Sequence, residues 1–178
     1  MLRQPLLHLL RSYSVKFPAE ASTTNQFVSF VEENENCFER SLLKGHVTAS
    51  GWVLNHNGSA VLLIHHLKLD KWLQPGGHCD GDADTLHVAV KECIEETGLE
   101  TQPVTMEIFD LDIHEIPQRK DIPAHLHYDV RYLLRANSNA QIAASETETN
   151  DVLWVPLNEV ANYTTEDSVM RMLAKTPA

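Results

Sequence analysis

Three glutamates lie close together near the middle of the chain, at Glu92, Glu95 and Glu96. They fall in a stretch with helical periodicity, and residues three and four apart share a helix face, so three carboxylates are expected to meet. Such a group destabilises a bare helix by about 0.2–0.5 kcal/mol per pair. A hard divalent cation reverses that effect, because carboxylate oxygens are the ligands that Mg²⁺ and Mn²⁺ prefer. The spacing indicates a metal site; the alternative is a solvated acidic helix face.

A glycine pair, Gly76 and Gly77, precedes this stretch. Glycine adopts backbone angles that are closed to other residues, so the pair can expose a main-chain carbonyl to a metal ion or let the backbone approach a phosphate. We expect the carbonyl of this loop and the carboxylates of the helix to share one ion cluster.

The segment from Gly77 to Leu99 resembles the box of the Nudix hydrolase family. That box reads Gly, five residues, Glu, seven residues, Arg-Glu, an aliphatic residue, any residue, Glu-Glu, any residue, Gly and an aliphatic residue. Counted from Gly77, the chain has Ala83 and then the run Lys91-Glu92-Cys93-Ile94-Glu95-Glu96-Thr97-Gly98-Leu99. The spacing and all three metal-side glutamates are kept.

The resemblance extends over roughly residues 45–160. The flanking segments Gly45–Ser50, Lys71–Pro75 and Trp154–Leu157 resemble the strands around the box in many such proteins. The fold that this implies is a Nudix-type α/β/α sandwich with a mixed β-sheet and an added N-terminal helical segment.

Two residues depart from the box, because Ala83 stands where the family has its first glutamate and Lys91 where it has arginine. In the family that arginine orients a metal-side glutamate, and lysine keeps its charge but loses the planar fork. Asp82 and Asp84 flank the missing glutamate and are candidates to replace it. We expect a lowered rate or an altered metal geometry; the alternative is a catalytically weak or inactive nucleotide-binding module.

The resemblance implies roles for the box residues. Glu92 and Glu96 are the expected principal ligands of Mg²⁺ or Mn²⁺, Glu95 a third ligand or a catalytic water-orienting group, and Gly76 a main-chain carbonyl ligand. The implied reaction is hydrolysis of a phosphoanhydride bond, in a nucleoside diphosphate linked to another moiety or a related small phosphorylated metabolite. The leaving half of the substrate is not readable.

The general base differs among relatives, and a glutamate beyond the box often serves. We choose Glu148, ahead of a strand, over Glu146 and Glu95. For substrate binding we select Gly77, His78, His127 and Tyr128, which offer backbone approach to phosphate, hydrogen bonds and base stacking.

Histidines form a second group that invites a chemical interpretation. His125 and His127 alternate on one face of a predicted strand, Asp129 follows, and His114 lies on the preceding strand. Such a cluster could bind zinc or another transition metal. The alternatives are substrate hydrogen bonding and a polar sheet face.

Helical and strand-like segments alternate in a way that predicts a mixed α/β sandwich. The predicted helices are 3–13, 20–34 and 83–97, the last stopped at Gly98, with one or two more after Pro156. The predicted strands are 46–54, 60–67, 104–116, 126–134 and 152–155, with a turn at 55–58 and a break at 75–77. We expect one domain over 1–178: an N-terminal helical segment 1–40, a core 45–160 and a C-terminal helix 161–178.

The composition restricts the partners. With 14 Lys+Arg against 25 Asp+Glu, the net charge is -11, so binding to duplex nucleic acid is not expected. The electrostatic field of this negative charge also repels a small polyphosphate, so a phosphate-binding site in this chain is expected to need bound cations. Apolar runs fall short of the roughly 20 residues that span a bilayer, so no membrane association is expected.

The three cysteines form no CxxC pair, which favours a reducing, cytoplasmic setting; they are Cys37, Cys79 and Cys93. The first residues lack acids and resemble a short transit peptide, but their apolar spacing favours a packed amphipathic helix. We expect a monomer or a homodimer.

Overall fold

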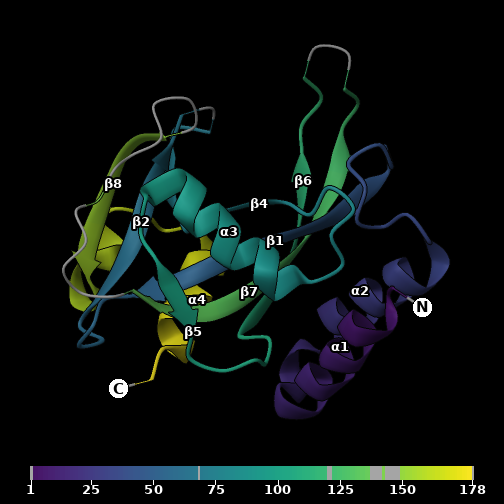
Figure 1. Cartoon of the computed structure of the whole chain (residues 1–178), viewed down its shortest axis with the longest axis horizontal. Coiled ribbons are helices and arrows are strands. Elements are labelled where there is room, and N and C mark those ends of the chain that lie inside the picture. Colours follow the sequence, from purple (N-terminus) through teal and green to yellow (C-terminus); the bar gives the residue numbers. More distant parts are fainter. Residues whose placement is uncertain (1, 68, 120–121, 137–141, 143–148, 178) are drawn as a thin grey trace.

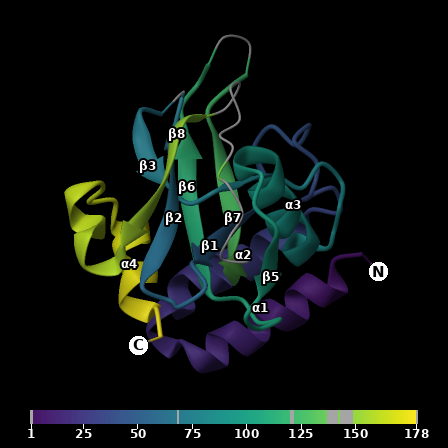
Figure 2. The same ribbon diagram turned by 60° about the vertical axis from the view of Figure 1, so that its left-hand side comes forward.

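The computed structural model describes residues 2–67, 69–119, 122–136, 142 and 149–177. Its helices are α1 (Gln4–Lys16), α2 (Ala21–Glu33), α3 (Thr85–Thr97) and α4 (Asp167–Lys175), with short 3₁₀ segments η1 (Pro18–Glu20) and η2 (Leu157–Asn162). Its strands are β1 (Gly45–Leu54), β2 (Ala60–His66), β3 (Lys71–Leu73), β4 (Gly76–His78), β5 (Thr101–Pro103), β6 (Asp110–Ile116), β7 (His125–Ala136) and β8 (Thr149–Pro156). Figures 1 and 2 show the arrangement from two sides.

The sheet is mixed and is built around β1 and β7. These two strands run parallel over ten residue pairs, from Gly45 opposite Leu126 to Leu54 opposite Arg135. On the far side of β7 lie the antiparallel strands β5 and β6. On the other side, β1 pairs with β4 and meets β2 at a single pair, Leu54 and Val61. Strand β2 also pairs antiparallel with β3 and with β8.

Helices cover both faces of this sheet, as the sandwich prediction requires. One core lies between the sheet and α1, α2 and α3, and it includes Leu10, Phe27, Val88 and Val130. The other lies on the opposite face, where Trp52 packs with residues of α4 such as Met172. The predicted α/β/α sandwich with a mixed sheet is therefore confirmed.

The two N-terminal helices pack on the domain through their apolar stripes. Leu6, Leu7, Leu10 and Tyr13 of α1 are buried. The Arg3 guanidinium donates hydrogen bonds to the carbonyls of Val31 and Glu32, each at 2.8 Å, and so satisfies the last turn of α2. The amphipathic-helix interpretation of the first residues is confirmed.

Several elements differ from the predicted ones: β8 is longer, at Thr149–Pro156, the C-terminal helix α4 is shorter, at Asp167–Lys175, and β3 was not predicted from the local pattern. The segment predicted as a strand from Val104 becomes one only at Asp110, because Thr105 accepts a hydrogen bond from the Glu107 amide and turns the backbone out of the ladder. The short strand β5 was not predicted. The predicted break at 75–77 gives way to β4, which pairs with residues 48–50 of β1.

Among the described residues, no helix combines the length and the apolar character that a membrane crossing requires.

Candidate active site

The helix that carries the three glutamates has well-defined ends. Asp84 caps its N-terminus by accepting a hydrogen bond from the His87 amide at 3.0 Å. Asp82 accepts from the Asp84 amide at 2.9 Å and contacts Nδ1 of His87 at 2.8 Å. Gly98, at φ 68°, closes the other end through a bond to the Ile94 carbonyl.

This capping changes the interpretation of the missing box glutamate. Asp82 and Asp84 are engaged at the start of α3, so the hypothesis that they replace the glutamate at Ala83 is not supported. Ala83 itself packs against the main core. At the position of the missing glutamate, the chain thus makes an apolar contact with the core.

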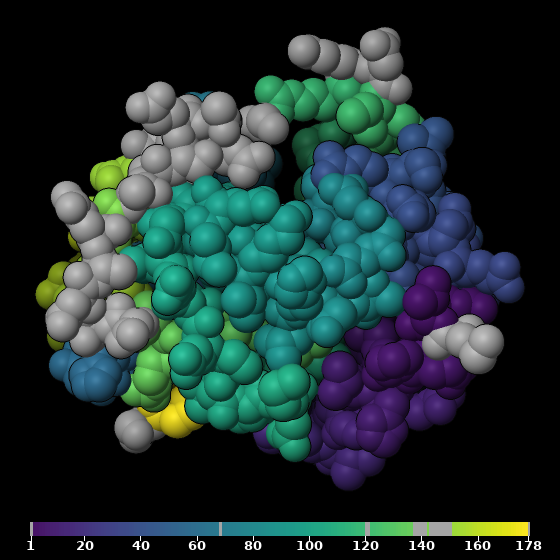
Figure 3. All heavy atoms as spheres, viewed as in Figure 1, coloured from purple at the N-terminus to yellow at the C-terminus, as the bar shows by residue number. Residues whose placement is uncertain are grey.

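One face of α3 rests directly on β1. Cys93 is fully buried there, and a Cβ atom added to Gly51 would lie 2.7 Å from its Sγ atom. Burial raises the pKa of the Cys93 thiol far above its usual range, so this group is no nucleophile. The close contact fixes the height of the helix over the sheet. Figure 3 shows α3, in teal, at the centre of one face of the molecule.

The glutamates meet the glycine pair on the side of α3 that faces β4. The Gly76 amide donates a hydrogen bond to Oε2 of Glu96 at 2.8 Å, and Glu96 is only 3% exposed. A Cβ atom on Gly77 would lie 2.3 Å from Oε2 of Glu92. Neither glycine has the left-handed φ that the sequence argument invoked, so that reason is wrong. Glycine is required at Gly77 because the Glu92 carboxylate approaches the backbone so closely, and at Gly76 because a Cβ atom there would lie 2.4 Å from the Cβ atom of Ser50.

Lys91 occupies the position of the box arginine and contacts two of the glutamates. Its Nζ atom lies 3.9 Å from Oε1 of Glu92 and 3.5 Å from Oε1 of Glu95. The Glu95 side chain is 54% exposed, against 13% for Glu92. Glu92 and Glu96 therefore form the inner pair beside the glycines, and Glu95 lies farther out.

Histidines gather on the opposite face of β4. His78 follows Gly77 in the strand, so its side chain points away from Glu92, and its ring centroid lies 5.0 Å from that of His127. Burial, with smaller contributions from neighbouring charges, lowers the pKa of His78 to about 4 and that of His127 to about 2. Both rings are neutral near pH 7.

Tyr128 lies apart from the other residues selected for substrate binding. Its ring stacks on Phe30 of α2, with centroids 3.8 Å apart, and lines a groove with Glu33 and Lys44. Successive strand residues point to opposite faces, so Tyr128 and His127 cannot share one site on β7. The structure brings together Gly77, His78 and His127, and separates Tyr128 from them.

A family model described as the NUDIX domain matches residues 44–175, which is well over half of the chain. The chain belongs to the Nudix hydrolase family. Both the box and its flanks, from β1 to α4, fall inside the matched region. No curated protein sequence matches the chain.

Solved structures share the Nudix fold. The MutT protein from Methanosarcina mazei Go1 is similar at 18% identity, with a TM-score of 0.58, over 76% of this chain and 94% of that one. A Caenorhabditis elegans Ap4A hydrolase matches at 18% identity with a TM-score of 0.53, over 72% and 93%. The Escherichia coli dihydroneopterin triphosphate pyrophosphohydrolase matches at 15% identity with a TM-score of 0.55, over 72% and 92%. At these identities the likeness concerns the fold.

The residues of the Nudix box fit a hard divalent cation. Glu92 and Glu96 offer carboxylate oxygens beside the main chain of Gly76 and Gly77, and the lack of a side chain on Gly77 lets Glu92 come this close. Oxygen donors of this kind suit Mg²⁺ or Mn²⁺.

Glu148, selected as the general base, lies outside the described residues, as does Glu146. Thr149, which follows Glu148 in the sequence, begins β8 and is paired with His66 of β2. The role of Glu148 stays a prediction.

Proposed function

We propose that this Nudix protein is a hydrolase that depends on Mg²⁺ or Mn²⁺ and cleaves a phosphoanhydride bond in a small phosphorylated compound, such as a nucleoside diphosphate linked to another moiety. The observation that supports this most directly is the inner pair, Glu92 and Glu96, packed against Gly76 and Gly77. Two carboxylates held close together beside the backbone, in a chain of net charge -11, repel each other, and a bound cation offsets that repulsion.

In this proposal Glu92, Glu96 and the Gly76 carbonyl bind the cation, and Glu95 is a third ligand or orients a water molecule. A bound cation supplies charge for the phosphate oxygens and lowers the pKa of a coordinated water. Phosphoryl transfer depends mainly on such positioning and charge stabilisation, so no covalent nucleophile is required. Lys91 holds Glu92 and Glu95 from the side, in place of the arginine of the family.

The remaining residues in the proposal handle the substrate and the proton. Gly77, selected for the approach of a phosphate, admits the Glu92 carboxylate beside its backbone. His78 and His127 contact the substrate from the opposite face of β4. Glu148 takes the proton from the attacking water. Tyr128, which stacks on Phe30, enters only if the substrate extends toward α2.

Two relatives in fold support the substrate class. By their names, the C. elegans protein hydrolyses Ap4A and the E. coli protein acts on dihydroneopterin triphosphate. Both compounds are small and carry a phosphate chain, and we extend that class to this protein.

A second candidate is a Nudix-fold module that binds nucleotide and metal without turnover. Ala83 and Lys91 favour it, because the box then lacks one carboxylate and the arginine fork. The intact glutamates favour hydrolysis more strongly, because they supply the cation ligands on which phosphoryl transfer depends.

A phosphate-release screen tests the proposal. The panel contains nucleoside triphosphates, dinucleotides, nucleotide sugars and non-nucleotide diphosphates, each assayed with Mg²⁺ and with Mn²⁺. We expect turnover that EDTA abolishes and either ion restores. Binding without release across the panel would support the module instead. Recovery with Zn²⁺ alone, lost in His125→Ala and His127→Ala, would move the catalytic site to the histidines.

A further inference from the structure

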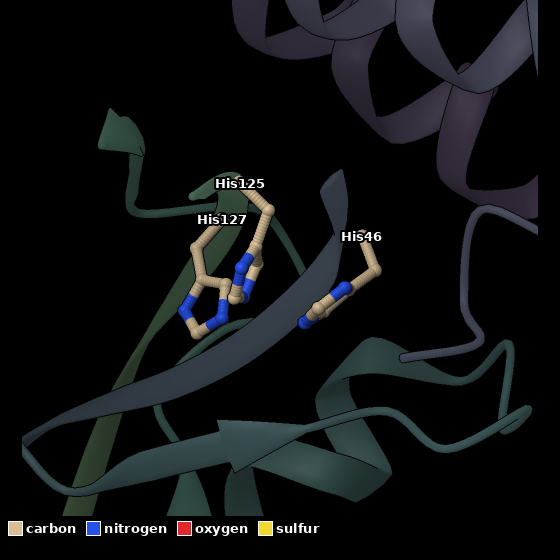
Figure 4. A group of neighbouring side chains, drawn as sticks. All are labelled: His46, His125 and His127. Carbon is tan, nitrogen blue, oxygen red and sulfur yellow. The ribbon is translucent and has the colours of Figure 1, made fainter. Parts of the chain in front are cut away.

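Three histidine rings from two neighbouring strands point into one space on the sheet, as Figure 4 shows. His46 is the second residue of β1 and lies directly opposite His127 in the parallel pairing with β7, and His125 precedes His127 by two residues. One ring nitrogen from each of the three lies within 4.8 Å of the others. The ring centroids are 4.9 to 5.3 Å apart. The sequence alone indicated His125 and His127 but not His46.

Three ring nitrogens of this group lack the well-aligned protein partners that buried polar atoms normally have. His46 is 3% exposed, and neither of its ring nitrogens has a hydrogen-bond partner of normal geometry among the described residues, although the backbone of Leu42 lies close enough to favour the protonated ring. Nε2 of His127 also lacks such a partner among these residues. A buried polar atom without a partner costs free energy, so each such atom calls for an explanation, and a bound ion is one of the few available.

A hydrogen bond to the backbone orients the His125 ring. Nδ1 of His125 lies 2.9 Å from the Pro123 carbonyl oxygen, which can only accept, so Nδ1 carries the proton. Nε2 of His125 is therefore left with its lone pair. Metal-binding histidines are commonly oriented in this way, by a backbone carbonyl on the nitrogen that does not bind the metal.

We propose that His46, His125 and His127 bind one first-row transition-metal ion, with Zn²⁺ as the expected ion, at a site separate from the glutamates of the Nudix box. Imidazole nitrogens suit Zn²⁺, Co²⁺, Ni²⁺ and Cu²⁺, whereas Mg²⁺ prefers oxygen ligands. Ligand nitrogens in a tetrahedral Zn²⁺ site lie about 3.3 Å apart, so small rotations of the three rings are enough to close this one.

A fourth ligand position is available next to these three. The His78 ring centroid is 5.0 Å from those of His46 and His127, so His78 or a water molecule can complete the shell. Glu92 lies on the face of β4 toward which a Cβ atom on Gly77 would point, and the His78 side chain lies on the other face. The histidine site and the carboxylate site are therefore on the two sides of that strand.

Equilibrium dialysis with metal analysis tests this proposal on the intact chain, without reference to activity. We expect one Zn²⁺ per chain in the presence of excess Mg²⁺, and visible bands of tetrahedral Co²⁺ in the cobalt-loaded protein. The single variants His46→Asn, His125→Ala and His127→Asn should each weaken Zn²⁺ binding by about 100-fold or more, since each removes a ligand. His56→Ala is the matched control, because His56 is exposed in the turn between β1 and β2.

The outcomes separate this site from the proposed active site. Glu92→Gln should leave Zn²⁺ binding unchanged while it weakens Mg²⁺-dependent turnover. His125 is only half-buried, so His125→Ala keeps the fold, and circular dichroism checks this for all variants. Two results would overturn the proposal: well under one Zn²⁺ per chain in the wild type, or Zn²⁺ binding that the histidine variants keep and Glu92→Gln loses.

Discussion

Gly77 and Glu92 are so close that a Cβ atom on the glycine would lie 2.3 Å from Oε2 of the glutamate. The contact joins β4 to α3, and with the bond from the Gly76 amide to Glu96 it aligns two carboxylates along one short strand. The glycine of the box thus serves to admit a carboxylate, and a larger residue there changes the position of a proposed metal ligand.

The variant Gly77→Ala tests this relationship. The nearest atoms are the end of a flexible side chain, so Glu92 can move aside and the fold should survive. We expect Mg²⁺ affinity and turnover to fall by about 10- to 100-fold, because the ligand is displaced but not removed. Mg²⁺ titrations of the rate, with a thermal melt as the control for folding, measure both effects. An unchanged Mg²⁺ dependence would mean that Glu92 does not bind the ion from this position.

Glu96→Gln removes a charge without changing the size of the side chain. The amide oxygen can still accept the hydrogen bond from Gly76, so the backbone contact is kept. Turnover should fall by about 100-fold or more, since one charged ligand is lost. The metal-free variant should be at least as stable as the wild type, because a buried carboxylate is no longer desolvated. The exposed Glu100→Gln is the control, and equal rates for Glu96→Gln and wild type at saturating Mg²⁺ would refute the assignment.

The helix and its glutamates could be predicted because their determinants are local. Asp84 and Gly98 mark the ends of α3 within the sequence itself, and the spacing of Glu92 and Glu96 follows from the helical repeat. The pairing of β1 with β7 is not local. It brings His46 opposite His127 across more than eighty residues, and no pattern in either segment specifies that register.

Two other features were misread for physical reasons that the structure makes plain. Gly76 and Gly77 suggested a loop, but the strand β4 forms because β1 supplies hydrogen bonds to it. Selecting both His127 and Tyr128 for one site disregarded strand alternation, which places neighbouring side chains on opposite faces.

A buried charge network gives a prediction for stability against pH. The Asp112 carboxylate lies 2.9 Å from Nδ1 of His114 and accepts a hydrogen bond from the Arg171 guanidinium at 3.1 Å. Burial alone would raise the pKa of Asp112, but these partners and Arg131 outweigh it and lower the pKa well below its usual range. A carboxyl with a depressed pKa in the folded state contributes stability above its unfolded pKa of about 3.9, and this is lost as the pH falls further.

Asp112→Asn should therefore lower the free energy of unfolding by about 1–3 kcal/mol at pH 7. The difference from wild type should shrink below about pH 4, where the unfolded wild-type carboxyl takes up a proton. Urea unfolding at pH 7, 5 and 3.5 measures it. Asp70→Asn is the control, since Asp70 is 89% exposed and its pair with His65 is at the surface. A constant difference across the three pH values would contradict this account.

The last prediction concerns the group that activates the attacking water. Glu148 directly precedes β8 in the sequence, in a segment rich in Ser, Glu and Thr that lies outside the described residues, and its role as general base is a prediction. A positioned general base contributes about 100- to 10,000-fold, so Glu148→Gln should lower kcat by that order. KM and metal affinity without substrate should stay nearly unchanged, because a general base acts on the attacking water and is neither a metal ligand nor a substrate contact in this proposal. Glu146→Gln, two residues away, is the matched control and should do much less. Profiles of rate against pH decide between the candidates: if Glu148→Gln keeps the wild-type kcat and acidic limb while Glu146→Gln or Glu95→Gln loses them, the base is that other residue.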